Sequence, residues 1–155
     1  LIQKVLDILN PSLNSSNIEV IKNIDDFEFV TIENDLIQIL MNIITNAKDA
    51  LIDLKDKEAR YIFINISKNQ KNIVIEIFDN AMGIKDEIIS RVFEPYFTTK
   101  HKSQGTGIGL YMSKILVDNN LKGNIAVENH TFIYNNKEFK GAKFIILLPI
   151  KLEKK

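Results

Sequence analysis

Cysteine is absent from the sequence, which excludes disulfides and thiolate metal sites. The two histidines, His101 and His130, are scattered, and this argues against a zinc site. Neither sign of charge is in excess, because 20 basic and 20 acidic residues cancel, so nothing favours nucleic acid or an acidic membrane as a partner. No apolar run approaches the roughly 20 residues that a membrane-spanning helix needs. A 155-residue chain that is 45% hydrophobic suits one globular domain with a sizeable core.

The first residues have neither the basic region nor the small-residue cleavage site of a signal peptide. The chain begins without methionine, and its first apolar residues have helical spacing: Ile2, Val5, Leu6 and Leu9. This pattern predicts the tail of a helix that belongs to a longer protein, although a trimmed start fits it too. Turn-forming residues follow at 10–16 and predict a linker.

Three pairs of strands and three helices are predicted along the rest of the chain. Alternating apolar residues indicate strands over residues 18–24, 27–32, 61–67, 72–79, 124–129 and 143–148. Helical spacing indicates helices over about 34–54, 88–93 and 109–119, the first with Asn34 as a plausible N-cap. This order predicts an α+β fold, a two-layer sandwich with helices on one face of a mixed, mostly antiparallel sheet.

The first long helix carries a polar stripe beside its apolar one. Asn42, Asn46 and Asp49 are spaced i, i+4 and i+7, so they lie on one helix face. Their side chains offer oxygen ligands, which suit a hard cation such as magnesium held together with phosphates. For these three residues alone, a solvated polar face is the simpler explanation. Asparagine is a weak helix former, however, and two of them one turn apart lower helix stability without evident gain.

A carboxylate, Asp79, ends the apolar run from Ile73 to Phe78 and is followed by Asn-Ala-Met-Gly-Ile. At the end of a strand and beside a turn, this carboxylate can accept a hydrogen bond from an amino group. Adenine presents such a donor at its exocyclic nitrogen, whereas guanine presents an oxygen there. Read alone, Asp79 fits a turn-initiating aspartate equally well.

Glycines at 105, 107 and 109 precede the last predicted helix. Glycine allows close backbone approach, and exposed amides at a helix start attract anions. The spacing matches neither a P-loop nor a dinucleotide-binding fingerprint, and a flexible loop explains the run by itself. In the segment from Arg91 to Lys100, the aromatic residues could anchor a mobile lid and Lys100 could meet a phosphate. A core-capping loop with an exposed lysine fits that segment as well.

Taken in order, four segments resemble motifs of the histidine kinase catalytic domain in the GHKL ATPase superfamily. Residues 38–50 are similar to its N box, 79–84 to the first glycine box, 93–100 to the F box and 105–110 to the second glycine box. The ending from Gly141 to Pro149 resembles the family's last strand. The resemblance covers about residues 18–150, and the F box distinguishes kinases from other members of the superfamily.

The resemblance implies that the chain binds magnesium-ATP and donates the γ-phosphate to a histidine on a separate dimerisation domain. It implies Asn46 as the magnesium ligand and Asp79 as the acceptor for the adenine amino group, under a lid over about residues 85–105. The expected catalytic set is Asn42, Asn46 and Lys100. The expected ATP-binding set is Asn42, Asn46, Asp49, Asp79, Ala81, Gly83, Ile84, Phe97, Thr99, Lys100, Gly105, Thr106, Gly107, Ile108, Gly109 and Leu110.

The resemblance also implies an organisation. Residues 1–17 are expected to be the end of the preceding helical dimerisation domain and its linker, and residues 18–155 the catalytic domain. The expected partners are that dimerisation domain and a response regulator receiver domain, with no nucleic acid and no direct membrane contact. The expected location is cytoplasmic, either in a soluble kinase or in the cytoplasmic part of a membrane-anchored one. The chain by itself is not expected to phosphorylate itself on histidine.

Two positions depart from the family's pattern. Ala81 stands where the first glycine of the Asp-x-Gly-x-Gly motif is usual, and Asp49 stands where many members have a phosphate-contacting lysine. Asp49 and the Phe-Glu-Pro of the F box match a subgroup related to nitrogen-regulation kinases. Two other functions stay open, a nucleotide-sensing module and a non-kinase ATP hydrolase of the gyrase or heat-shock chaperone type. Those hydrolases place a glutamate base where this chain has Asn42, which cannot take a proton.

Overall fold

The computed structural model describes residues 1–54, 59–97 and 108–150. Within them, five strands form one mixed sheet in the order β1-β2-β3-β5-β4. The parallel neighbours are β1 (Ile18–Ile24) and β2 (Arg60–Lys68). The other pairs are antiparallel and add β3 (Asn72–Asp79), β5 (Lys137–Pro149) and β4 (Asn124–Tyr134).

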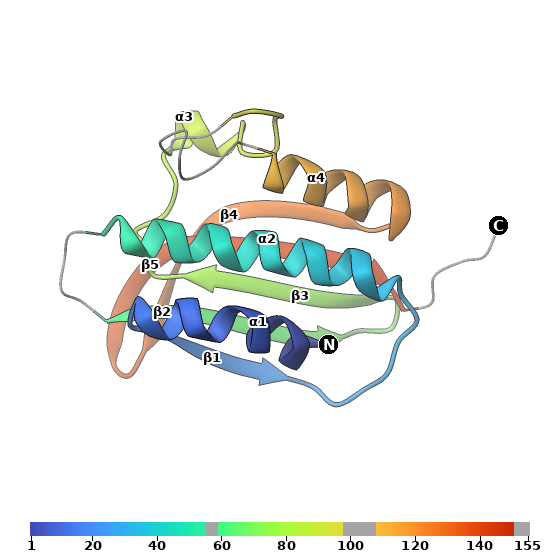
Figure 1. The fold of residues 1–155 in the computed structure, drawn as a ribbon, viewed down its shortest axis with the longest axis horizontal. Helices are drawn as coiled ribbons and strands as arrows, with labels where there is room; N and C mark the ends of the chain where they lie inside the picture. Colours follow the sequence, from blue (N-terminus) through green and yellow to red (C-terminus); the bar gives the residue numbers. More distant parts are fainter. Residues whose placement is uncertain (55–58, 98–107, 151–155) are drawn as a thin grey trace.

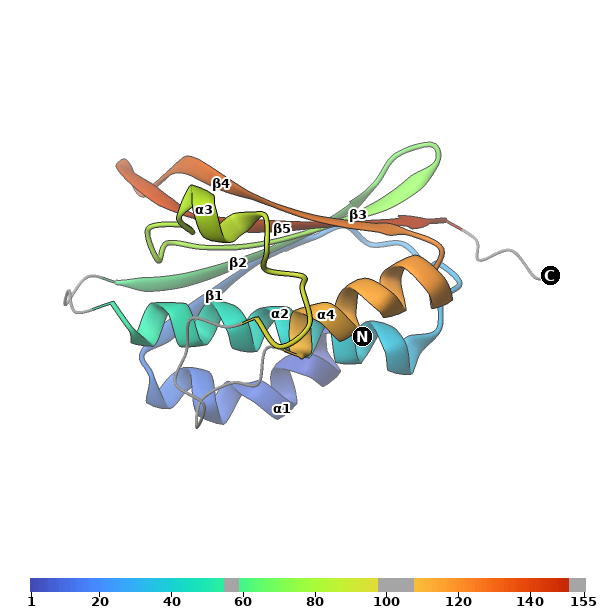
Figure 2. The same ribbon diagram turned by 90° about the horizontal axis from the view of Figure 1, so that it is seen from above.

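Helices α1 (Ile2–Ser15), α2 (Glu33–Ile52) and α4 (Gly109–Ile115) lie on one side of this sheet (Figures 1 and 2). α4 continues into a π-helical turn, η1 (Leu116–Asn120), and the short α3 (Asp86–Ile89) follows the loop after β3. The predicted α+β sandwich with a mixed, mostly antiparallel sheet is confirmed. In the described part of the chain, no helix is long and apolar enough to cross a membrane.

The core lies between α2 and the sheet. Every third or fourth residue of α2 is apolar and buried, because helical spacing places these residues on one face: Leu36, Ile39, Leu40, Ile43, Ile44, Ala47 and Leu51. β3 contributes Ile73, Ile75 and Ile77, which alternation places on the same face of the sheet. Each such aliphatic side chain contributes roughly 1.5–3 kcal/mol to stability when fully buried. This packing fixes the polar stripe of α2 relative to the end of β3.

Helix α1 is longer than predicted. It continues through the exposed Pro11 to Ser15, so the predicted linker at residues 10–16 is wrong. Its buried residues, Ile2, Val5, Leu6 and Leu13, belong to the same core cluster as α2 and the sheet. Burial of this apolar face outweighs the turn propensity of the asparagines and serines. The assignment of residues 1–17 to a preceding dimerisation domain stays a prediction, and in the structure α1 shares one core with the catalytic part.

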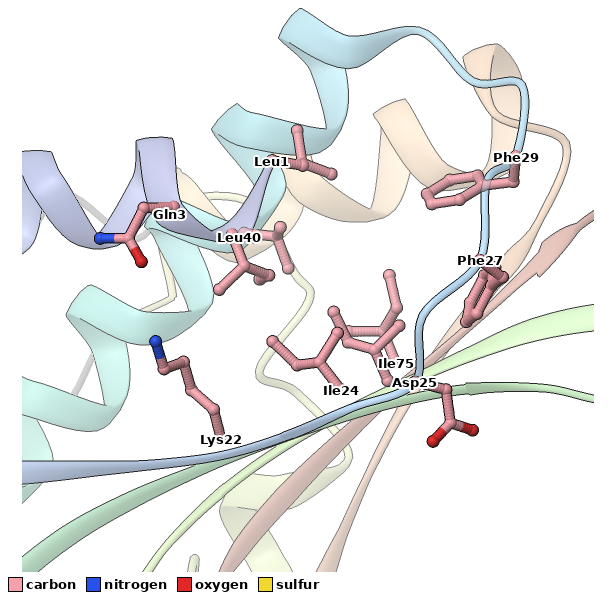
Figure 3. A pocket seen from close by; sticks show the side chains of 11 residues that line it. Leu1, Gln3, Lys22, Ile24, Asp25, Phe27, Phe29, Leu40 and Ile75 are labelled. Carbon is pink, nitrogen blue, oxygen red and sulfur yellow. The ribbon is translucent and has the colours of Figure 1, made fainter.

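The predicted strand over residues 27–32 is also wrong, since Val30 alone makes a bridge there. β1 pairs with β2 instead, and Phe27 and Phe29 pack against the core from the connection to α2. They line a hollow of about 300 Å³ with Ile24, Leu40 and Ile75 (Figure 3). The hollow lies away from the predicted site, because Ile75 is four residues before Asp79 along β3, about 13 Å at 3.3 Å per residue.

Several boundaries differ from their predictions. α2 begins at Glu33 with Ile32 as N-cap, so Asn34 lies in the first turn and is not the cap. α3 spans Asp86–Ile89 and not 88–93. β4 and β5 extend beyond the predicted 124–129 and 143–148, and they are joined by Asn135 and Asn136, with φ values of 51° and 62°. Positive φ at both central residues is typical of a type I′ hairpin turn.

Candidate functional site

Asp79 is the last residue of β3 and is 3% exposed. Its Oδ1 accepts hydrogen bonds from the backbone N–H of Ala81 at 2.9 Å and of Ala142 at 3.3 Å. Burial removes water from the carboxylate and raises the pKa of Asp79 to about 6, although the two backbone N–H donors act in the opposite direction. A buried carboxylate at a strand end is a strong acceptor for an amino group brought to it by a ligand.

The neighbouring strand β5 passes very close to Asp79. A Cβ atom at Gly141 would lie 1.7 Å from the backbone oxygen of Asp79 and 2.9 Å from its Oδ1. Such distances are far inside van der Waals contact, so β5 can take this path only with glycine at position 141. Gly141 thereby brings the N–H of Ala142 within reach of the carboxylate.

The loop after Asp79 is held by side-chain amides. The Asn80 side chain accepts from Tyr61 N–H at 2.9 Å and donates to the Ala59 carbonyl at 2.8 Å. Gly83 has φ +84°, a backbone conformation that glycine adopts readily and other residues rarely adopt. Ala81 is not among the described residues with positive φ, so alanine is compatible with the backbone where the family usually has glycine.

Asn42 connects α2 to the start of α4. Its Nδ2 donates to the Gly109 carbonyl and to Ser113 Oγ, both at 3.0 Å. Its Oδ1 accepts from Gln38 Nε2 at 3.0 Å. Ser113 is completely buried and donates in turn to the Gly109 carbonyl at 2.9 Å. The Asn42 amide is therefore engaged at both ends, and it fixes the beginning of α4 beside α2.

Asn46 lies one helical turn further along α2 and is half-buried. In residues 1–54, 59–97 and 108–150, the Asn46 side chain has no hydrogen-bond partner, and its carbonyl oxygen is available to a ligand. Asp49, also half-buried, has its Oδ1 4.0 Å from Lys48 Nζ. The C-terminal ends of α2 and β3 lie at the same end of the sheet (Figure 1), and Asp79 is the last residue of β3.

The segment after α3 is anchored by aromatic rings. Phe93 packs edge-on against Phe144 of β5, with ring centroids 6.2 Å apart. The Arg91 guanidinium lies 4.4 Å from the centroid of the Phe97 ring and also pairs with Glu94 at 2.7 Å. The Phe93–Phe144 contact holds this part of the predicted lid against β5, while the two Arg91 contacts lie within the segment itself.

The structure places part of the predicted ATP-binding set. It brings Asn42 into direct contact with Gly109, while Ile84, Phe97, Ile108 and Leu110 are half-buried. Five predicted residues lie outside the described residues: Thr99, Lys100, Gly105, Thr106 and Gly107. Three residues near the site were missed: Asn80, Ser113 and Asn129. Ser113 lies four residues after Gly109, a spacing that could have indicated a shared helix face. No local signal marks Asn129.

The family of histidine kinase-, DNA gyrase B- and HSP90-like ATPases matches residues 31–152 of the chain. The chain belongs to this family. Within it, the chain is a catalytic ATP-binding domain of the two-component sensor histidine kinase type. The F-box resemblance to kinases agrees with this assignment.

Two curated relatives and one solved protein illustrate the similarity. Sporulation kinase E of Bacillus subtilis (strain 168) is 31% identical over 154 residues, which cover 97% of this chain and 19% of that kinase. A putative sensor histidine kinase, NtrY-like, of Rickettsia bellii (strain RML369-C) is 32% identical over 96 residues, 62% of this chain and 15% of the relative. The chain thus spans less than a fifth of the length of either kinase.

The solved catalytic domain of histidine kinase ThkA, in a nucleotide-free form, shares the fold with a TM-score of 0.77 at 24% identity, covering 99% of this chain and 93% of that one. ThkA has also been solved in complex with the response regulator protein TrrA. ThkA in that complex matches this chain with a TM-score of 0.73 at 22% identity, and the match covers 99% of this chain and 40% of that one.

Proposed function

We propose that this chain binds magnesium-ATP and presents the γ-phosphate to a histidine on a separate dimerisation domain of the same kinase. The observation that carries this proposal is the buried Asp79 carboxylate at the end of β3, together with Asn46 in the C-terminal half of α2, whose amide makes no hydrogen bond within the described residues. The C-terminal ends of these two elements lie at the same end of the sheet (Figure 1). The carboxylate is suited to an amino group and the amide to a metal ion. A nucleotide held with magnesium offers both.

Asp79 is proposed to bind the exocyclic amino group of adenine. Its Oδ1 accepts from two backbone N–H groups, which fixes the plane of the carboxylate before any ligand arrives. Guanine would present an oxygen to this acceptor and leave a buried charge facing a lone pair, which is strongly unfavourable. Ala81, Gly83 and Ile84 are proposed to border the base, with Phe97 beside it.

Asn46 is proposed as the magnesium ligand, since amide oxygens suit this hard cation and its side chain has no other described partner. Asn42 is proposed to serve the phosphates through Gly109, whose carbonyl it holds. Asp49, Ile108 and Leu110 complete the described part of the phosphate end. The roles of Lys100, Thr99 and the glycines at 105 and 107 are carried by the family resemblance. Bound magnesium would neutralise phosphate charge, so the residues contribute mainly by positioning.

Hydrolysis is the competing function. An ATP hydrolase needs a base that takes a proton from water, and Asn42 occupies that helix position here. An amide cannot take the proton, and this amide is engaged with Gln38, Gly109 and Ser113. We therefore favour transfer over hydrolysis. A nucleotide-sensing module without transfer is favoured by no described contact, because Ala81 does not disturb the loop.

Phosphotransfer tests the proposal directly. The chain is incubated with radiolabelled magnesium-ATP and a histidine-bearing dimerisation domain from its own kinase, and acid-labile, base-stable label is expected on that domain. Asn46→Ala is expected to reduce transfer at least tenfold, whereas Asn34→Ala, an exposed asparagine of the same helix, should leave it unchanged. Label that stays on the chain and disappears in His130→Ala would contradict the proposal. His130 is packed against Phe132 and Phe78, with ring centroids 5.2 and 5.0 Å away.

Finer assignments are also part of the proposal. Asp49, the Phe-Glu-Pro sequence at Phe93 and the likeness to an NtrY-like kinase support membership of the nitrogen-regulation-kinase-like subgroup. A response regulator receiver domain is the proposed final acceptor, and the complex of ThkA with the response regulator protein TrrA supports it as a partner. We place the chain in the cytoplasm, where ATP is available.

A further inference from the structure

We infer that Asn129 is a positioning residue for adenine recognition, because its side chain clamps the loop that follows Asp79. This inference rests on the proposed function. Asn129 lies on β4, and its Oδ1 accepts from Ile84 N–H at 2.7 Å. Its Nδ2 donates to the Ile84 carbonyl at 2.6 Å. The amide therefore satisfies both backbone groups of one residue, as a neighbouring β-strand would.

The same amide also lies directly against the neighbouring Gly83. A Cβ atom at Gly83 would lie 2.7 Å from Asn129 Oδ1, and the backbone there has φ +84°. The loop approaches β4 closely enough for the two hydrogen bonds only because residue 83 has no side chain. The glycine of the motif and the asparagine of β4 are thus two halves of one contact, although they are distant in the sequence.

Asn129 holds the loop at the point where other anchors end. Asn80 ties the beginning of the loop to β2, and Met82 N–H donates to the Lys140 carbonyl at 2.9 Å. The Met82 side chain is 62% exposed and contributes little packing. Beyond Ile84 the chain leaves toward α3, so the Asn129 clamp determines where this exit lies relative to Asp79.

The consequence concerns the base and not the phosphates. A loop released at Ile84 leaves the Asp79 carboxylate in place, because its partners are Ala81 and Ala142. It no longer holds the edge of the base against Asp79, so the hydrogen bond from the exocyclic amino group, which inosine triphosphate lacks, is weakened. Affinity for adenine nucleotides should therefore fall, while contacts from α2 and α4 to the phosphates are kept.

The test compares ATP with inosine triphosphate, which lacks the exocyclic amino group, by calorimetry on the folded chain. Asn129→Ala removes both hydrogen bonds and is expected to weaken ATP binding about tenfold, with inosine triphosphate binding changed less than twofold. Asn129→Asp keeps the acceptor for Ile84 N–H but loses the donor, so an intermediate loss is expected. Asn124→Ala changes an exposed asparagine of the same strand and should alter neither affinity.

The outcomes separate the two levels of the proposal. A preference for ATP that collapses in both Asn129 variants, with the melting temperature of Asn129→Asp near wild type, supports the inference. A preference that is unchanged in both variants but lost in Asp79→Asn overturns the role of Asn129 and leaves the proposed function standing. Equal loss of ATP and inosine triphosphate binding would show general loosening of the site and would also overturn it. A preference unaffected by Asp79→Asn overturns the proposed function itself.

Discussion

The proposed base end of the candidate site, around Asp79, and its proposed phosphate end, on α2 and α4, are built differently. At the base end, Asp79, Asn80 and Asn129 each bond to backbone groups of the surrounding strands and loop. At the phosphate end, two asparagines one turn apart on α2 have opposite situations. Asn42 has both ends of its amide engaged, whereas the Asn46 amide makes no hydrogen bond to the part of the chain that the structure describes.

Under the proposed function, this difference separates recognition of the base from binding of the metal ion. A flat base is read by groups that must already be in place, because each misplaced hydrogen bond leaves a buried polar atom unpaired. A metal ion needs a ligand oxygen that is not used elsewhere, since a committed oxygen must first lose its protein partner. The sheet supplies the fixed groups, and one helix face supplies both a fixed group and an available one.

The largest effect is expected at Gly141. Gly141→Val places a side chain against the backbone of Asp79, where even a Cβ atom would come within 1.7 Å of the carbonyl oxygen. Because backbone must move, we expect a loss of about 3 kcal/mol or more in the free energy of unfolding, at the upper end for overpacking. Urea denaturation measures it.

Gly109→Ala is the matched control at the phosphate end. A Cβ atom there would meet Asn42 Cγ at 3.6 Å, an ordinary contact, and alanine favours a helix by about 1 kcal/mol over glycine. Stability should be unchanged or slightly higher. If both glycine variants lose stability equally, the base end is no more tightly built than the phosphate end.

Asp79→Asn should affect binding and stability in opposite directions. Asparagine keeps an oxygen for Ala81 N–H and Ala142 N–H but no longer offers a carboxylate to adenine, so ATP affinity should fall about 10- to 100-fold. The buried charge is also removed. We expect the free energy of unfolding of the nucleotide-free protein to rise by on the order of 1–3 kcal/mol at pH 7.5, since one pKa unit corresponds to about 1.4 kcal/mol.

The direction of the pKa shift of Asp79 determines how stability changes with pH. The folded pKa of Asp79, about 6, lies above the ordinary value of 3.8, so the folded state holds the proton more tightly than the unfolded state. Stability from this group therefore falls as pH rises from about 4 to 6 and stays low above that. The stability difference between Asp79→Asn and the wild type should shrink toward zero near pH 4. A constant difference across this range would rule out burial of the charge as its cause.

The sequence identified the strand before Asp79 because Ile73, Ile75 and Ile77 alternate and are all buried. Alternation misled at Phe27 and Phe29, whose rings cover the core from a connection and not from a strand. A strand needs a hydrogen-bonding neighbour, and β1 finds its neighbour in β2, beyond the whole of α2. No local sequence pattern predicts such a pairing.

In the candidate site, too, local sequence patterns indicated single elements but not contacts between distant ones. Asp79 and the α2 stripe were predictable because each is marked by its own element, a strand end and a helix face. Asn129 was not, since its partner Ile84 is 45 residues away along the chain. An asparagine in a polar stretch of a strand has no feature that distinguishes it from a solvated residue until the fold brings the two together.

The two asparagines of α2 give a smaller and more specific test of the comparison. Asn42→Ala breaks the link to Gly109 and Ser113 and should lower the free energy of unfolding by about 1–3 kcal/mol. Asn46→Ala has no described partner to lose and should change stability by less than about 0.5 kcal/mol. It should instead remove the magnesium dependence of ATP binding, measured by calorimetry with and without magnesium. If Asn46→Ala keeps the wild-type magnesium dependence, the available amide is a surface residue.

Among the substitutions in the candidate site, the smallest effect on ATP affinity is expected at Ala81, where the family usually has glycine. The described backbone does not have a positive φ there, so glycine is not required, and the Ala81 N–H bonds Asp79 Oδ1 whatever the side chain. The methyl group packs against the core, and glycine adds freedom to the unfolded chain. Ala81→Gly should therefore lower stability by about 0.5–1 kcal/mol and change ATP affinity less than twofold.

Gly83→Ala, two residues on, is the contrasting variant, because φ is +84° and Asn129 Oδ1 blocks a Cβ atom. It should weaken ATP binding several-fold more than Ala81→Gly. A tenfold gain in ATP affinity for Ala81→Gly would mean that alanine restrains this loop and that the base end is less well preformed than its hydrogen bonds indicate.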